Sequence, residues 1–122
     1  MHQAELKPVY WIASSKADLK SFPETVQDHM GFALYQAQIG SKNRDAKPLK
    51  GLGPGVLEVV SRHEGDTYRA VYAVRFEQAV YVLHAFQKKA KRGIATPKKE
   101  IDLVKRRLKA AQNHYEARSG KS

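Results

Sequence analysis

The apolar and polar positions at the start of the chain predict a short strand and then a short helix. Residues 9–12 are strand-forming side chains directly after Pro8, which is typical of a strand at the edge of a sheet. Ser14 or Ser15 can cap a helix that continues through Lys20.

A second helix is predicted between Pro23, which suits a first helical turn, and Gly40, which suits a C-terminal cap. Apolar residues recur within it at three- and four-residue steps, as the buried face of a helix requires. These residues are Val26, Met30, Ala33 or Leu34, and Ala37. The first 40 residues are therefore predicted to form a strand followed by a helical hairpin.

The middle of the chain predicts an antiparallel meander. Residues 41–55 have the composition of a loop, because Gly, Pro and Lys dominate them. Strand formers then fill residues 56–62, 67–75 and 79–86, with turn residues between them. Alternation places Arg69 on one face with Val71 and Ala73, and places His84 on one face with Val80, Val82 and Phe86.

The last element predicted is a basic amphipathic helix. It begins at Thr96, a capping residue, and Pro97, which suits the first helical position. Its apolar stripe consists of Ile101, Val104, Leu108, Ala111 and Tyr115. The elements together predict an α+β fold, with one domain over residues 1–118 and a flexible tail at 119–122.

Charge is distributed unevenly along these elements. The chain of 122 residues has a net charge of +10, and residues 87–122 hold twelve Lys and Arg against three acidic residues, a net +9. Such an imbalance indicates a polyanionic partner or an acidic protein partner.

Several classes of protein are disfavoured by the composition. Cysteine is absent, which excludes disulfides and thiolate zinc sites and fits a reducing cytoplasm. The five histidines have no metal-ligand spacing, so we expect no metal and no cofactor. The longest uncharged apolar stretch, residues 79–86, is too short to cross a membrane. Glu5 and Lys7 interrupt the region where a signal peptide would be apolar.

Five segments, in this order, give the chain a resemblance to a known family. They are Pro-Leu-Lys-Gly-Leu-Gly at 48–53, Leu-Glu-Val at 57–59, Tyr-Arg-Ala-Val-Tyr at 68–72, His-Ala-Phe-Gln-Lys-Lys at 84–89 and Thr-Pro-Lys-Lys-Glu-Ile at 96–101. In this order and spacing the chain resembles the RelE/ParE toxin superfamily. RelE has lysines where this chain has Glu58 and Val60, so the resemblance is to the HigB-like, phage-derived branch.

The resemblance implies a RelE-like fold and the function of a toxin in a two-gene toxin–antitoxin module. Many such toxins are endoribonucleases that cut messenger RNA in the ribosomal decoding site. A ribose 2′-hydroxyl attacks the adjacent phosphate without a metal, which leaves a 2′,3′-cyclic phosphate and a 5′-hydroxyl. The partners implied are the ribosome, its message and an antitoxin, commonly a helix-turn-helix protein encoded by the adjacent gene.

The same resemblance suggests catalytic residues. Arg69 occupies the position of a catalytic arginine within Tyr-Arg-x-x-Tyr, and its guanidinium suits phosphate oxygens. Lys88 and Lys89 correspond to a basic pair that clamps phosphate. His84 is a candidate for proton transfer because imidazole titrates near neutrality, and Tyr72 can stack on a base or orient a phosphate.

Each of these residues also has a structural interpretation: a solvated cation for Arg69 and the lysines, and a core residue for His84 and Tyr72. Lys47 and Lys50 on the loop, and Lys91 and Arg92 after the basic pair, are further candidates for RNA binding.

Two other functions remain compatible with the sequence. ParE-like relatives with this fold inhibit DNA gyrase by binding, without catalysis. A non-toxic basic protein that binds nucleic acid would need only the charge, although the sequence contains no obvious aromatic platform for single strands.

Overall fold

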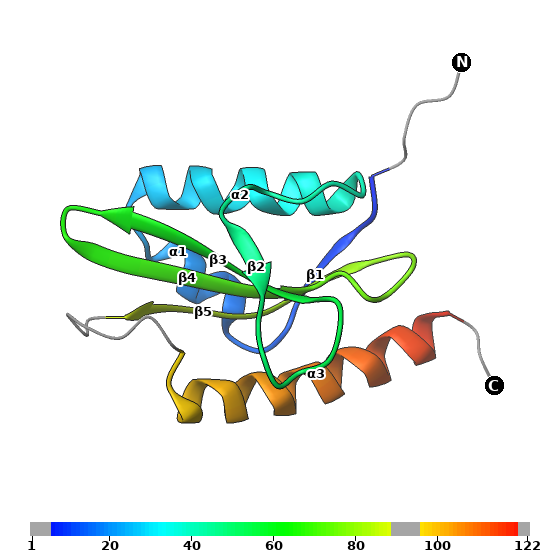
Figure 1. The fold of residues 1–122 in the computed structure, drawn as a ribbon. Coiled ribbons are helices and arrows are strands. Elements are labelled where there is room, and N and C mark those ends of the chain that lie inside the picture. Colours follow the sequence, from blue (N-terminus) through cyan, green and yellow to red (C-terminus); the bar gives the residue numbers. More distant parts are fainter. Residues whose placement is uncertain (1–5, 89–95, 120–122) are drawn as a thin grey trace, which may run out of the picture.

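The computed structural model describes residues 6–88 and 96–119, which form a five-stranded sheet between two helical layers (Figure 1). The elements are β1 (Val9–Trp11), α1 (Ser15–Lys20), α2 (Glu24–Gln38), β2 (Ala46–Pro48), β3 (Val56–His63), β4 (Asp66–Ala73), β5 (Val80–Lys88) and α3 (Lys98–Arg118). The α+β fold predicted from the sequence is confirmed. Residues 120–122 of the predicted tail lie outside the described residues.

The centre of the sheet is the predicted meander, with β4 antiparallel to both β3 and β5. β1 forms one edge and runs parallel to β5. The other edge is β2, which pairs with β3 inside the segment predicted as a loop. That prediction was wrong for three residues because an edge strand tolerates Pro48, whose missing N–H removes no bond from the interior of the sheet.

Each face of the sheet carries its own core, and Figure 1 shows α2 and α3 on opposite sides of the strands. The α2 side buries Leu57, Val59, Ala70, Tyr72, Val80 and Val82. The α3 side buries Val56, Val71, Ala73, Tyr81, Leu83 and Val104. Both faces of the meander are therefore covered, as their many apolar residues require.

A β-bulge on β5 changes which face His84 occupies. Val71 pairs with His84, but the next residue, Tyr72, pairs with Val82, so Leu83 is an extra residue on β5. Val82 consequently faces α2 while His84 lies on the α3 side. The prediction that His84 shares a face with Val80 and Val82 was wrong because alternation assumes a strand without bulges.

The helix ends follow the predictions only in part. Gly40 has a φ of +83°, the left-handed conformation expected of a residue that terminates α2. Thr96 does not cap α3, because Pro97 is the N-cap residue and the Thr96 hydroxyl donates to Glu58 instead, at 2.6 Å. None of the described helices is both long enough and apolar enough to span a membrane.

Candidate functional site

The register of the sheet places polar residues of four strands on its α3 side. Side chains of directly opposed residues point to the same face of a sheet. One row across the strands contains Lys47, Glu58, Val71 and His84. The next row along the strands contains Val60, Arg69 and Phe86. The row after it contains Arg62, Thr67 and Lys88. Arg69, His84 and Lys88 are thus brought to one face of the sheet, in three successive rows.

Arg69 is the most buried cation of this face. Its Nη1 donates to Glu58 Oε1 at 2.8 Å, and the two residues are only 4% and 3% exposed. The second carboxylate oxygen of Glu58 accepts the bond from Thr96. Arg69 Nε is buried and has no hydrogen-bond partner within the described residues. The Glu58 carboxylate therefore balances the charge of the Arg69 guanidinium. Arg69 is not a solvated cation at the surface.

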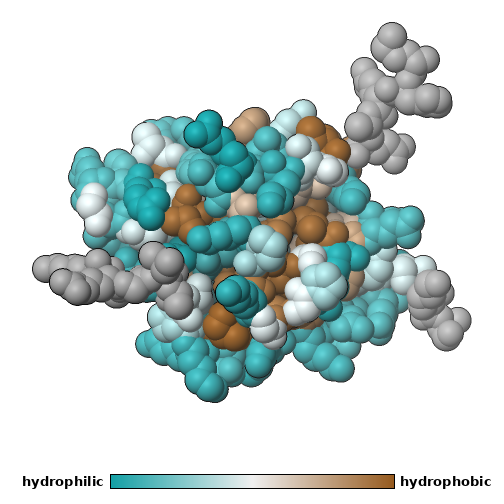
Figure 2. Space-filling model, in the orientation of Figure 1, coloured by the Kyte–Doolittle hydropathy of each residue, from teal (hydrophilic) through white to brown (hydrophobic). Residues whose placement is uncertain are grey.

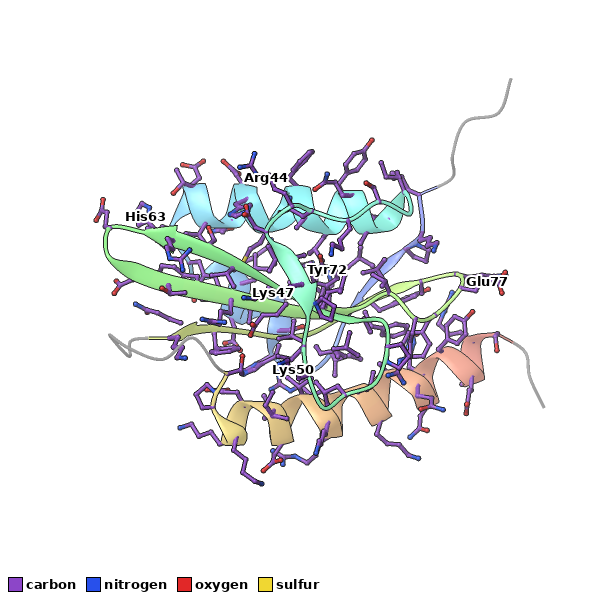
Figure 3. The ribbon with its side chains drawn as sticks, in the orientation of Figure 1. Arg44, Lys47, Lys50, His63, Tyr72 and Glu77 are labelled. Atoms are coloured by element: carbon purple, nitrogen blue, oxygen red, sulfur yellow. The ribbon has the colours of Figure 1, made fainter. Side chains whose placement is uncertain are left out.

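Beside Arg69 the surface forms a small basic pocket of about 240 Å³. Its cations are Arg44, Lys47 and Arg62, with Arg69 as the fourth, and Asp45 is the carboxylate among its lining residues. We call these four cations and the space between them the anion pocket. In Figure 3, Lys47 lies on β2 in front of the sheet, and Arg44 lies just before β2, at the level of α2. Guanidinium and ammonium groups in this arrangement suit a phosphate group.

The segment that carries Arg44 and Lys47 is anchored on both sides. His29 on α2 contacts Asp45 Oδ2 through Nε2 at 2.9 Å and Ser61 Oγ through Nδ1 at 2.8 Å. Asn43 is buried, and its side-chain oxygen accepts from the Asp45 amide at 2.8 Å. These bonds hold the backbone on either side of Arg44 and so fix where Arg44 and Lys47 leave the chain.

His84 is on β5, two strands away from the β3 residues that line the anion pocket. It is in contact with α3. Its Nε2 is 2.6 Å from Glu100 Oε1, and its ring stacks on Phe86 with centroids 4.8 Å apart. Arg107 donates to the Leu83 carbonyl at 3.0 Å and lies 3.4 Å from His84 Nδ1. A cation beside Nδ1 and a carboxylate beside Nε2 favour the tautomer that carries its proton on Nε2, directed at Glu100.

The remaining sequence candidates are placed as follows. Lys88 lies at the end of β5 on the same face as Arg69 by register, and Lys50 is exposed on the loop after β2, outside the anion pocket (Figure 3). Lys89, Lys91 and Arg92 lie outside the described residues.

Tyr72 does not join this site. It is 0% exposed in the core on the α2 side, and its hydroxyl has no partner within the described residues. Burial raises the pKa of Tyr72 to about 12. Arg69 and His84 lie on the opposite, α3 side of the sheet, so a substrate on that side cannot reach Tyr72.

Sequence reasoning missed several residues that the structure adds to the site. Arg62 follows Glu58 and Val60 at strand spacing, so alternation along β3 would have found it. Arg44 is not detectable in this way because it lies in a loop. Glu100 belongs to the family-like segment at 96–101, but its contact with His84 could not be predicted, because it depends on how α3 packs on β5.

Within residues 6–88 and 96–119, no group of three or more His, Cys, Asp or Glu side chains could hold a metal ion. Hydrophilic residues cover the outer side of α3, at the bottom of Figure 2, where Lys105, Arg106 and Lys109 are exposed.

Comparison with known proteins identifies a family and solved structures of similar fold. The family of phage-derived Gp49-like proteins matches residues 17–109. A double mutant of the Escherichia coli toxin RelE in the free state has a similar fold, with a TM-score of 0.52 and 18% identity over 66% of this chain and 82% of that one. A second structure is the toxin–antitoxin complex RelBE2 of Mycobacterium tuberculosis, with a TM-score of 0.47 and 18% identity over 74% of this chain and 100% of the other. No curated protein matches the sequence.

Proposed function

Since the chain belongs to the phage-derived Gp49-like family and has a RelE-like fold, we propose that it is the toxin of a type II toxin–antitoxin module. The activity we propose is ribosome-dependent cleavage of messenger RNA, which inhibits translation in the cytoplasm. The observation that carries the proposal is one face of the sheet on which the anion pocket, Lys88 and the His84–Glu100 pair lie together.

The two parts of this face would act on different phosphates. Lys47 and His84 belong to one row but are separated by three strand spacings, or about 14 Å at the usual distance between strands. A single phosphate cannot span that distance. The anion pocket would therefore hold a phosphate that flanks the cut, while the scissile phosphate lies near His84. Lys88 is four residues further along β5, about 13 Å at the usual rise per residue, so it would contact a different phosphate of the message.

The reaction needs a base for the 2′-hydroxyl, positive charge beside the phosphoryl oxygens and an acid for the departing 5′-oxygen. The His84 imidazole would serve as the proton-transfer group on this face, and Glu100 orients its ring. Arg107, whose Nη1 lies 3.4 Å from His84 Nδ1, would supply positive charge there, while Lys88 at the end of β5 would neutralise a neighbouring phosphate. Positioning of the message would come from the ribosome, which explains how so small a domain could suffice.

A second function is favoured by one observation. Arg69 is paired with Glu58, and His84 is only 7% exposed, so both groups are partly withdrawn from solvent. A protein that inhibits DNA gyrase by binding alone would not need Arg69 or His84 to be accessible to a substrate. The ParE-like alternative therefore remains a candidate function.

The partner expected for either function is an antitoxin encoded by the neighbouring gene. An acidic segment of such a protein would complement the net charge of +10. A helix-turn-helix antitoxin would also let the pair repress its own operon.

One experiment separates the two functions. Purified protein is incubated with message, with and without ribosomes, and the 5′ ends of the products are mapped; a parallel reaction measures supercoiling by gyrase. Cleavage that needs ribosomes and leaves 5′-hydroxyl ends is the expected result. Intact message together with inhibited supercoiling would replace the nuclease with the gyrase inhibitor.

A further inference from the structure

A larger hollow lies at the opposite end of β5 from Lys88, between the N-terminal segment, the turn before β5 and the end of α3. It has a volume of about 600 Å³, within the range typical of small-molecule sites. Its lining includes Lys7, Tyr10, Glu77, Tyr81, Tyr115 and Arg118. We call this space the tyrosine hollow. Glu77 lies at the turn between β4 and β5 in Figure 3, far along the sheet from the turn that carries His63.

The half-buried rings of Tyr10 and Tyr115 face the tyrosine hollow, and the fully buried ring of Tyr81 packs behind them. Tyr10 and Tyr81 have ring centroids 5.2 Å apart, and Tyr81 and Tyr115 have centroids 6.4 Å apart. The Tyr81 hydroxyl is 2.6 Å from His114 Nδ1, which fixes the central ring. Burial, together with the neighbouring Tyr10, raises the pKa of Tyr81, so this ring stays neutral and adds no negative charge to the wall.

Cations form the rim. The Arg118 guanidinium lies 5.2 Å from the centroid of the Tyr10 ring, and Lys7 lines the same space. Glu77 is the carboxylate of the lining and is exposed. Within the part of the chain that the structure describes, no ion pair joins Lys7, Arg118 or Glu77 to another side chain. The charges of the rim are therefore open to a ligand.

We propose that the tyrosine hollow binds one nucleotide, with its base against Tyr10, Tyr115 and Arg118 and its phosphate on the cations of Lys7 and Arg118. Bases pack on aromatic rings and on guanidinium planes, and the same cation binds phosphate oxygens. Glu77 accepts hydrogen bonds from a base with N–H donors. Guanine, whose ring N–H and amino group lie side by side, suits a carboxylate better than uracil, which has one such N–H.

This binding site does not depend on the proposed nuclease, because its residues lie apart from the anion pocket and His84. The ligand is a nucleotide in either of two forms: a free mononucleotide, or one nucleotide of a single-stranded RNA. Both sources are included in the test.

The test is an NMR titration of the full chain with guanosine monophosphate (GMP), in parallel with uridine monophosphate (UMP), inorganic phosphate and a single-stranded RNA hexamer that contains one guanosine. GMP should shift the amides of residues 6–10, 77–79 and 115–119 and should bind more tightly than UMP or phosphate. Arg118→Gln should weaken GMP binding by about tenfold, as expected for the loss of a charge-assisted contact. The control Lys105→Gln, which removes the same charge from the outer side of α3, should change it less than about twofold.

Each outcome decides the question. Shifts of these amides by the hexamer identify RNA as the source, and shifts by GMP alone identify a free nucleotide; both support the site. Shifts confined to Arg44, Lys47 and Arg62, or no shifts at all, would overturn it. Equal affinity for GMP and phosphate would show that the base is not recognised. Equal affinity for GMP and UMP would show that Glu77 does not select guanine. Arg118 is exposed, so its substitution should leave the fold intact, and thermal unfolding of the variant checks this.

Discussion

Arg69 and Glu58 form an ion pair inside the protein, with Nη1 and Oε1 2.8 Å apart and both side chains almost completely buried. The pair joins two central strands, β4 and β3, and Thr96 extends it to the segment before α3. The residue most strongly suggested as catalytic is thus also a structural residue. Any experiment on Arg69 has to separate these two roles.

The first prediction concerns the stability of this pair. Glu58→Ala should lower the free energy of unfolding by about 3–5 kcal/mol, because it leaves the Arg69 charge buried without compensation. Urea unfolding measures the change, and Glu64→Gln, at the exposed turn after β3, is the control. The double variant Glu58→Leu with Arg69→Met should recover most of the loss. A stable Glu58→Ala protein would show that the pair is open in solution.

The same reasoning changes how Arg69 can be tested for catalysis. Arg69→Ala alone does not isolate a catalytic role, because this substitution also leaves the buried Glu58 carboxylate without its ion-pair partner. The stable double variant is the better probe. If it still cleaves message at the normal rate, Arg69 has no part in the chemistry.

The second prediction concerns the anion pocket. Arg62→Gln and Arg44→Gln should each weaken binding of single-stranded RNA, and each should reduce the slope of log affinity against log salt by about 0.7 per lost phosphate contact. Fluorescence anisotropy at several salt concentrations gives the slope. Lys16→Gln, on the exposed side of α1, is the control with the same change of charge. An unchanged slope in both pocket variants would show that RNA binds elsewhere.

The third prediction concerns His84 and Glu100. His84→Gln should slow ribosome-dependent cleavage by about a hundredfold or more, the usual effect of losing a general acid or base. Glu100→Gln keeps an acceptor beside Nε2 but removes its charge, so the rate should fall by a smaller factor. Rates are compared at saturating ribosome concentration, with thermal unfolding as the check on folding. Wild-type rates in His84→Gln would exclude His84 from proton transfer.

The fourth prediction concerns Tyr72, whose pKa rises from 10.0 to about 12 on folding. Above pH 10 the unfolded chain loses this proton more readily than the folded one, so the folded state becomes less stable as pH rises from 10 to 12. Tyr72→Phe should remove this contribution and should lose less stability between pH 9 and pH 11.5 than the wild type does, as urea unfolding would show.

Tyr72→Phe also tests the catalytic role suggested by the sequence. The hydroxyl has no partner within the described residues, so its removal should be neutral or stabilising at pH 7. Cleavage should be unchanged. A large loss of activity in a stable Tyr72→Phe protein would mean that the sheet rearranges when substrate binds.

The sequence by itself determined most of the elements and the branch of proteins to which the chain belongs. Periodicity found α2 and its end at Gly40, the three strands of the meander and the apolar stripe of α3, because each is a repeat among near neighbours. Alternation also placed Arg69 on the correct face of β4, since that strand contains no bulge. The excess of positive charge, and with it the expectation of an anionic partner, needed no structure.

The tertiary structure alone decided what those residues face. The extra residue Leu83 moved His84 to the face of Arg69, the packing of α3 brought Glu100 to His84, and strand pairing supplied Glu58 to Arg69. The anion pocket and the tyrosine hollow likewise join residues from separate elements. Such contacts are set by strand register and by packing between distant segments, and the local repeat of a sequence contains neither.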